Sequence, residues 1–269
     1  MRRPLSSLNP FFYFFIVKLR RFERYIKWWI GKKKYAKTIS TERLEYRVYK
    51  HQSVLIRKLG DSDLILQYNK VENLKIAINK INGIIIKPGE KFSFWKLVGC
   101  PTKKKGYLEG MLLSEGEAVS GIGGGLCQIV NLIHWLCLHS PLTVSERHHH
   151  SYDPFPDQGR VVPFGSGASV FYNYIDYQFI NETEYAFQLL FWFDDKCLNG
   201  DLRINIELPY KYHVFEKNHE FIKVEELFYR RNELWREKYY KKGSGEAIET
   251  ELLQKNNALA KYVPEEYNT

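Results

Sequence analysis

Residues 121–141 of the chain read GIGGGLCQIVNLIHWLCLHSP, a glycine-rich turn followed by an apolar segment. From Leu126 to His139 the apolar residues recur at helical spacing, which predicts a helix with one buried face. Pro141 cannot continue a helix and ends it. The consecutive glycines before the helix allow a tight turn and close approach to the main chain. We therefore expect Cys127 at the start of a buried helix.

The residues before this turn predict a helix and then short strands. Residues 63–86 carry apolar side chains at helical spacing up to Gly83, followed by the β-branched run Ile84–Ile86. A turn at residues 87–90 separates this run from a strand at Phe92–Phe94.

The residues after the cysteine helix are predicted to be mainly β, with Val170–Tyr174 and Tyr185–Phe193 as the clearest strands. The tail from Tyr210 fits either a helix or a hairpin that turns at Lys242–Gly245. The order of helix, glycine turn, helix and then strands predicts an α+β fold. In it the glycine turn and helix carry the cysteine, and a mainly antiparallel β region follows.

The positive charge is concentrated at the N-terminal end. Residues 1–38, here called the basic arm, contain eleven Lys and Arg against the single acid Glu23, a net charge of +10, whereas the whole chain of 269 residues carries +9. Such a distribution predicts no nucleic-acid partner, since no recognition motif accompanies it. We divide the chain into the arm (1–40), a central domain (41–208) and a C-terminal extension packed on it (209–269).

Aromatic side chains are interleaved with the basic residues of the arm, in FFYFFIV at residues 11–17 and at Trp28–Trp29. This pattern suits an anionic membrane surface, and the alternative is a helix packed on the body. The apolar run is too short to span a bilayer, which needs about 20 residues. No small-residue cleavage site follows it. A cytoplasmic or membrane-surface location is therefore expected rather than secretion.

Cys127 has the features of a nucleophile. Unpaired N–H groups at a helix start favour an anion, so we expect a lowered pKa for this thiol. The turn around Gly124 and Gly125, with the side chain of Gln128, would bind a developing oxyanion. The alternative is a turn shaped for packing, with the cysteine as a small buried hydrophobe. The four sparse cysteines predict neither a disulfide framework nor a structural zinc site.

The base that Cys127 requires is expected in ERHHHS at residues 146–151. His134 lies seven residues along the helix, about 10 Å away, which is too far. In an extended segment His148 and His150 would share one face, one as base and one holding substrate. Arg147 beside them would bind a carboxylate.

Two other interpretations of the histidines remain open. His148 and His150 with the Cys127 thiolate would form a zinc site with an open position. Alternatively, the histidines belong to a polar loop. The preferred interpretation needs no cofactor or metal. Asp176, an acid within an aromatic strand, is a costly residue unless paired, and is the candidate to orient the histidine.

Four motifs together resemble the VanW family, which takes its name from an accessory protein of vancomycin-resistance gene clusters. They are IKPGEKFSFWKLVG (86–99), KKGYLEG (104–110), GIGGGLCQ (121–128) and ERHHHS (146–151), and the likeness continues through residues 164–183. It resembles the short, single-domain type of the family and runs from about Asn73 to Asn205.

The resemblance implies an L,D-transpeptidase-like acyl transfer on cell-wall peptides or precursors, with Cys127 as nucleophile and His150 as base. The family usually has Asp where this chain has Gly167. Two other functions are carried forward. One is a zinc-dependent hydrolase that uses His148, His150 and Cys127. The other is a non-catalytic binding protein that accompanies cell-wall or glycopeptide-resistance systems.

Overall fold

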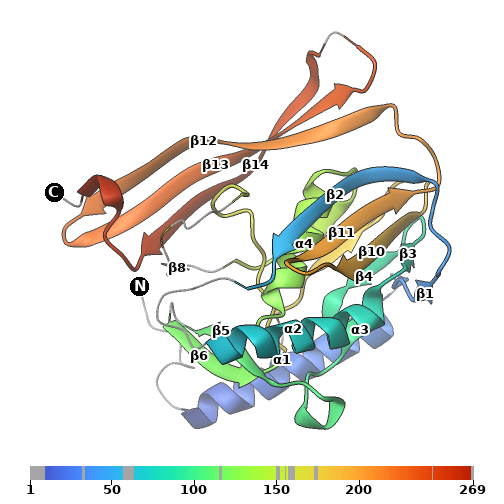
Figure 1. Cartoon of the computed structure of the whole chain (residues 1–269). Helices are drawn as coiled ribbons and strands as arrows, with labels where there is room; N and C mark the ends of the chain where they lie inside the picture. Colours follow the sequence, from blue (N-terminus) through green and yellow to red (C-terminus); the bar gives the residue numbers. More distant parts are fainter. Residues whose placement is uncertain are drawn as a thin grey trace.

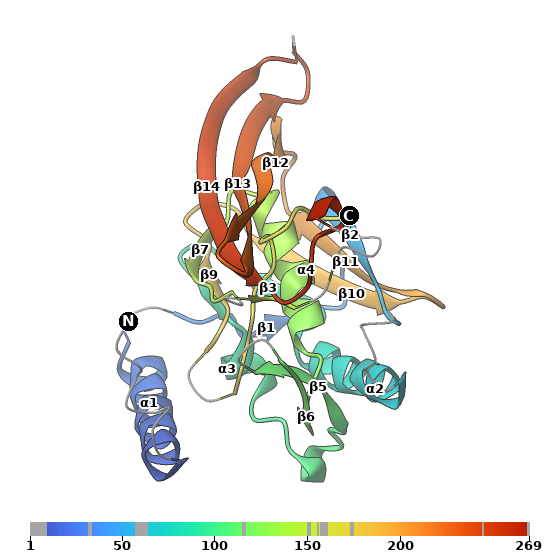
Figure 2. The same cartoon turned by 90° about the vertical axis from the view of Figure 1, so that its left-hand side faces the viewer.

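The computed structural model describes residues 10–31, 34–56, 64–114, 117–149, 152–154, 156, 161–172, 175–243 and 245–267. Helix α4, Cys127–Leu138, lies at the centre of the molecule (Figures 1 and 2). Its apolar residues are buried on almost every side, because β2 and β11 pack against it from one direction and the C-terminal sheet from another. The helix predicted around the glycine turn is confirmed.

The main sheet has five antiparallel strands in the order β1-β3-β10-β11-β2. Its strands are β1 (Thr38–Ile39), β2 (Tyr46–Val54), β3 (Ile84–Ile86), β10 (Phe187–Phe193) and β11 (Cys197–Ile204). Helix α2, Leu64–Ile81, precedes β3 and buries its apolar side chains in the same core. Two sequence predictions are confirmed here, the helix followed by a strand and the strand that ends at Phe193.

Two smaller sheets flank the central helix. One joins β4 (Lys91–Ser93), β9 (Gln178–Ile180) and β7 (Thr143–Glu146), and the other is the hairpin of β5 (Glu109–Ser114) and β6 (Glu117–Ile122). The strand predicted at Phe92–Phe94 ends one residue early, because Ser93 caps α3 (Phe94–Val98) by accepting a hydrogen bond from Lys96 N. A 3₁₀ turn, η2, covers Lys103–Lys105.

The strand predicted at Val170–Tyr174 is wrong within the described residues, where only isolated bridges occur at Ser169 and Phe171. Side chains of α4 bond to the backbone at the start of this stretch and just before it. Asn131 Oδ1 accepts from Ala168 N, and the Cys127 thiol donates to Val170 O.

The C-terminal residues form a long antiparallel sheet, which decides the tail in favour of strands over a helix. It contains β12 (Tyr210–Val224), β13 (Leu227–Tyr240) and β14 (Ala247–Ala260), with the short β8 (Tyr152–Asp153) parallel to β14. The connection between β13 and β14, residues 241–246, contains the predicted Lys242–Gly245 turn segment. A last 3₁₀ turn, η3, covers Glu265–Tyr267. The α+β class, with mainly antiparallel strands after the cysteine helix, is confirmed.

This sheet packs on α4 through a small apolar cluster and one arginine. Trp135 and Leu138 of α4 pack with Val214 of β12. Arg236 of β13 donates to Leu138 O and Ser140 O, carbonyls at the C-terminal end of the helix. These contacts satisfy acceptors that a helix end leaves open.

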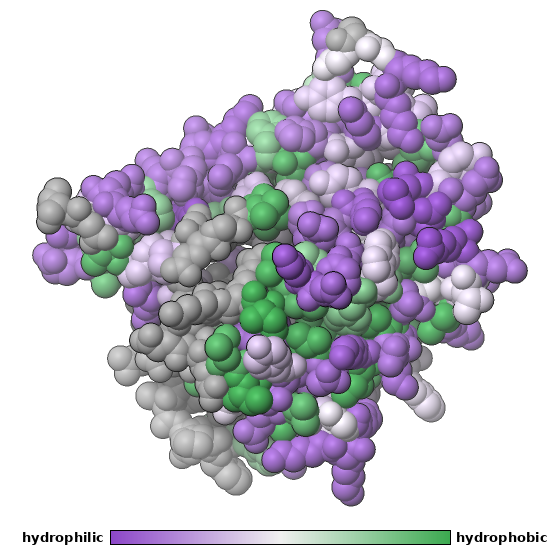
Figure 3. Space-filling view, viewed as in Figure 1, coloured by the Kyte–Doolittle hydropathy of each residue, from purple (hydrophilic) through white to green (hydrophobic). Residues whose placement is uncertain are grey.

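Helix α1, Pro10–Ile30, lies along the outside of the body (Figure 2). Its inner face makes an ion pair from Arg24 to Glu146, and Trp28 packs on the core. None of the helices within the described part of the chain combines the length and apolar character that crossing a bilayer requires. On the face seen in Figure 3, apolar residues gather near the start of α2, where Leu64 and Ile65 are exposed.

Candidate functional site

Cys127 is the first residue of α4, and it lines a cavity of about 260 Å³. The wall comes from distant parts of the chain, because α1 contributes Arg21 and α3 contributes Trp95. The remaining lining residues are Cys100, Pro101, Leu112, Ile122, Gly123, Leu126, Val170, Phe171 and Tyr172. The cavity is mainly apolar with one arginine, a composition typical of a small-molecule site.

Burial raises the pKa of the Cys127 thiol, although its own backbone N–H opposes that rise. The expectation of a lowered thiol pKa is therefore wrong for this structure, even though the predicted helix position is correct. The physical reason is that protein atoms surround the thiol, which donates to Val170 O at 3.7 Å. Loss of water disfavours the charged thiolate more than the helix start favours it.

The glycine turn is shaped largely by packing. A Cβ on Gly124 would fall 2.1 Å from the backbone of Gly110, and one on Gly125, where φ is +89°, would fall 2.1 Å from Lys70 Cγ. Gly124 N donates to Gly121 O, and Gly124 O accepts from Asn73 Nδ2 of α2. The sequence allowed this turn to bind an oxyanion or to serve close packing, and these contacts show the packing role.

The side chain of Gln128 makes structural hydrogen bonds instead of the oxyanion contact predicted from the sequence. Its Nε2 donates to Ser53 Oγ at 2.9 Å and to Val54 O at 2.8 Å, both at the end of β2. This amide therefore joins α4 to the main sheet. Sequence reasoning could not find these partners, because β2 lies more than 70 residues earlier in the chain.

The ERHHHS motif lies at the end of β7, and its described residues have different hydrogen-bond partners. Arg147 is largely buried, with Nε donating to Gly167 O at 2.8 Å and Nη2 to both Gly165 O and Gly167 O. Burial lowers the pKa of its guanidinium to about 10. These donors bind the backbone of the 165–167 loop. The sequence had predicted that they would bind a substrate carboxylate instead. The predicted base His150 lies outside the described residues.

His148 points to an acid that the sequence reasoning missed. Its Nε2 lies 3.2 Å from Oε1 of Glu146, two residues earlier. Burial raises the pKa of Glu146, but hydrogen bonds from His148 and Arg24 and the charge of Arg24 outweigh this and lower it to about 2. The signal was present in the sequence, since residues i and i+2 of an extended segment share a face.

Asp176 is buried and serves a different set of partners. Its carboxylate accepts hydrogen bonds from Ser93 Oγ at 2.5 Å, Trp95 N at 3.0 Å and Gln178 Nε2 at 2.8 Å. The expectation that a paired acid occupies this position is met, but the pairing ties α3 to β9. Desolvation raises the pKa of Asp176 despite these bonds. Among the described residues, Glu146 and not Asp176 contacts a histidine of this motif.

An extended segment, residues 167–170, runs between Cys127 and His148. On one edge Gly167 O accepts from Arg147, and Ser169 N donates to His148 O at 2.7 Å. On the other edge, Ala168 N and Val170 O bond to α4. Because neighbouring extended strands lie about 4.8 Å apart, this segment separates the His148 backbone from the thiol. A Cβ on Gly167 would lie 3.1 Å from Asn131 Oδ1, so a side chain there would point to α4.

His134 of α4 and His139, the residue that caps the end of this helix, are buried in the core. His134 Nδ1 lies 3.1 Å from Tyr177 Oη, and His139 stacks on Tyr49 with ring centroids 3.7 Å apart. Burial lowers the pKa of His139 to about 4, and burial also lowers the pKa of His134 well below its ordinary value. Both imidazoles are therefore neutral near pH 7.

A metal site is not formed within the part of the chain that the structure describes, where no three His, Cys, Asp or Glu side chains cluster. The zinc set considered from the sequence includes His150, which lies outside that part. The described members, Cys127 and His148, lie on opposite edges of the 167–170 segment.

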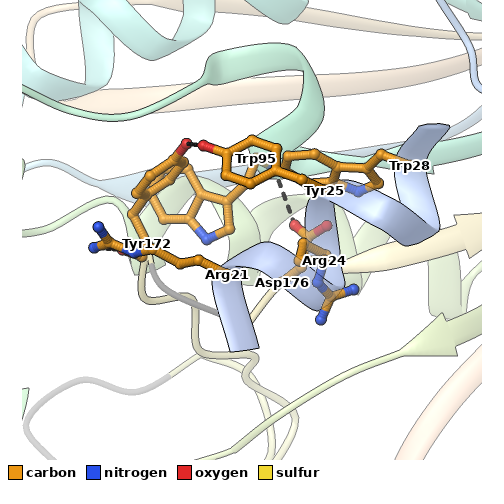
Figure 4. Close-up of a pocket in the computed structure, with 7 residues that line it drawn as sticks. All are labelled: Arg21, Arg24, Tyr25, Trp28, Trp95, Tyr172 and Asp176. Carbon is orange, nitrogen blue, oxygen red and sulfur yellow. Dashed lines mark hydrogen bonds between the residues drawn. The ribbon is translucent and has the colours of Figure 1, made fainter. Parts of the chain in front are cut away.

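Helix α1 lines a separate, smaller pocket, shown in Figure 4, which shares Arg21, Trp95 and Tyr172 with the Cys127 cavity. Arg21 Nη2 donates to Tyr172 O at 2.6 Å, and the hydroxyls of Tyr25 and Tyr172 are 2.6 Å apart. The Arg24 guanidinium forms two 2.5 Å hydrogen bonds to the Glu146 carboxylate. Glu146 thus connects α1 to His148, and Arg21 brings positive charge to the cavity.

Comparison with known proteins agrees with the extent of these motifs. The family model described as "VanW like protein" matches residues 69–203. The "Vancomycin B-type resistance protein VanW" of Enterococcus faecalis is 31% identical over 265 residues, 97% of this chain and 94% of that protein. The "Uncharacterized protein YoaR" of Bacillus subtilis is 29% identical over 115 residues, 42% of this chain and 36% of that protein. No solved structure matches.

Proposed function

Because the chain belongs to the VanW family, we propose that it acts in vancomycin-type resistance by acyl transfer on cell-wall peptides or their precursors. The single observation that carries this proposal is the position of Cys127, which lines the 260 Å³ cavity at the start of α4. Arg21 in the same wall supplies a positive charge for a peptide carboxylate. Trp95 and Tyr172 offer apolar surface for the rest of a short peptide.

In the proposed reaction the thiol gives its proton to His150, and the sulfur bonds to a peptide carbonyl carbon. The C–N bond then breaks, and the leaving amine takes the proton. A second amine, or water, attacks the thioester carbon and restores the thiol, which leaves a new amide or an acid. The Cys127 N–H, at the open end of α4, is the donor proposed for the oxyanion.

The test is mass-spectrometric detection of a thioester on Cys127 after incubation with muropeptides. The wild type should acquire the acyl group, Cys127→Ala should not, and Cys100→Ala, which alters another thiol of the same cavity, should react as the wild type does. His150→Ala should slow acylation by roughly 100-fold or more, the usual contribution of a general base. Equal peptide turnover by Cys127→Ala would refute acyl transfer.

A second candidate is a non-catalytic protein that binds a wall precursor, and the raised thiol pKa favours it. A thiol that stays protonated is a poor nucleophile. In this case Gln128 and Arg147 have the structural roles seen here, and the cavity only recognises its ligand. Muropeptide binding, measured by calorimetry, would then be the same in Cys127→Ala, with no thioester in the wild type. Loss of binding in that variant alongside a trapped thioester would exclude this candidate.

A further inference from the structure

The outward face of α1 is apolar along its whole length. Phe12, Phe15, Leu19, Phe22, Ile26 and Trp29 alternate at spacings of three and four residues, which places them on one side of a helix. All are exposed, Trp29 to 91% and Phe22 to 62%. We call these six residues the outer stripe. The helix turns this stripe away from the body, since Arg21, Arg24 and Trp28 make its contacts with the domain.

Positive charge accompanies the outer stripe. Lys18, Arg20 and Lys27 are exposed side chains of the same helix, and they belong to the basic arm with its net charge of +10. Exposed aromatic rings beside lysine and arginine suit the boundary between lipid headgroups and acyl chains. Each basic residue near an anionic leaflet strengthens binding roughly fivefold.

We propose that the outer stripe of α1 docks this protein on an anionic membrane surface. The helix lies in the plane of the interface, with its aromatic side chains in the headgroup boundary and Lys18, Arg20 and Lys27 at the phosphates. The Arg24–Glu146 pair and the Tyr25–Tyr172 hydroxyl contact fasten the other face of the helix to the domain. Docking of α1 therefore anchors the whole domain, and this does not depend on the chemistry of Cys127.

A second copy of the chain fits the stripe less well. Pairing two stripes would bring together two arms of charge +10 each, whereas an anionic leaflet neutralises that charge. Coiled-coil seams are usually built from Leu, Ile and Val, but four of the six stripe residues here are Phe or Trp.

The first experiment is co-sedimentation of the full chain with vesicles of phosphatidylcholine alone or mixed with phosphatidylglycerol. Binding should be roughly tenfold or more stronger on the anionic vesicles and should weaken as salt is raised. Phe22→Ser combined with Trp29→Ser should lower binding about tenfold. The matched control, Val224→Ser with Leu227→Ser, removes two apolar residues that are 48% and 47% exposed at a distant turn, and should bind as the wild type does.

A charge-matched pair of variants tests the electrostatic part. Lys18→Gln with Lys27→Gln should weaken binding to anionic vesicles by about tenfold or more. Lys104→Gln with Lys242→Gln removes the same charge elsewhere and should leave binding unchanged. Far-ultraviolet circular dichroism checks that each variant is folded.

Three outcomes would overturn the proposal. The first is equal binding to neutral and anionic vesicles, and the second is unchanged binding after the stripe substitutions. The third is a protein that does not bind vesicles and that light scattering shows to be a dimer, which the stripe substitutions dissociate. That last result would assign the stripe to a second copy of the chain.

Discussion

Glu146 connects three parts of the molecule through one carboxylate. It accepts from Arg24 of α1, from Asp176 N before β9 and from His148, so its ionised form is held by partners from well-separated segments. Its pKa of about 2 is below that of an unfolded glutamate. The stability it contributes is therefore present above the unfolded pKa and is lost as pH falls through about 2.

We expect Glu146→Gln to lower the free energy of unfolding by roughly 2–3 kcal/mol at about pH 6, because the charge-assisted bonds are lost. The gap between the two proteins should shrink by roughly half at about pH 3, where the wild-type contribution is itself partly lost. Urea unfolding of the wild type and the variant at the two pH values measures this difference in the free energy of unfolding. A gap that stays constant with pH would show that the carboxylate charge is not responsible.

Cys127 provides a second prediction at this scale. Burial raises the pKa of its thiol, so without ligand its alkylation should be slow at neutral pH and accelerate only above the ordinary thiol value of about 8.5. Peptide mapping after timed iodoacetamide treatment across pH gives the midpoint, and Cys100→Ala removes the other thiol of the cavity. A midpoint below neutral pH would contradict the buried geometry and restore the expectation of a lowered pKa.

The elements are held together by a few side chains that cross between them. Arg236 of β13 reaches the end of α4 and also pairs with Glu251 of β14 at 2.6 Å. We expect Arg236→Ala to cost about 1–3 kcal/mol of stability, because two carbonyls at the helix end lose their donor. Lys238→Ala, two residues along the same strand, breaks the 3.8 Å pair with Glu249 and the contact of the ammonium with the Tyr210 ring, and it should cost about 0.5–1 kcal/mol. Denaturant titrations of both variants measure the two losses of stability. Equal losses would show that the contacts of Arg236 with the helix end contribute nothing extra.

The elements that could be predicted from the sequence are those whose local pattern matches their burial. Helices α2 and α4 and the strands β3 and β10 are buried, and their apolar periodicity shows this directly. The tail gave an ambiguous prediction because β12 is mostly exposed, so its apolar pattern is weak. The segment from Val170 looked like a strand, but Val170 O accepts from the Cys127 thiol of α4 and Phe171 N donates to Ile175 O within the same segment.

The candidate site was predictable only in part, for the same reason. The position of Cys127 at a helix start follows from the glycines and the apolar run that flank it. The partners of Asp176, Gln128 and Arg147 lie far away in the sequence or on backbone atoms, and a motif does not show them. Burial of the thiol, which donates to Val170 O, is likewise a tertiary effect, and it reverses the direction of the expected pKa change.

At the scale of the whole molecule, the C-terminal sheet covers one side of α4. Trp135 and Leu138 pack there with Val214. From β13, the side chain of Asn232 donates a hydrogen bond to Phe164 O. A chain that ends at Pro209 would expose this side of the helix. We expect it to melt several degrees lower than the full chain and to bind a hydrophobic dye, both measurable by fluorescence during heating. An unchanged melting temperature without dye binding would show that the sheet is an independent addition.

The origin of the cavity wall matters for the search for inhibitors. Arg21 and the residues that fasten α1 come from the first 30 residues, whereas the thiol lies nearly 100 residues further on. A shortened protein that begins at Thr38 would keep Cys127 but lose the cationic side of the cavity. A screen of thiol-reactive fragments on it would select compounds for a wider and less basic opening. Those compounds would be matched to a shape that the intact chain does not offer, so hit discovery should use the protein with α1 in place.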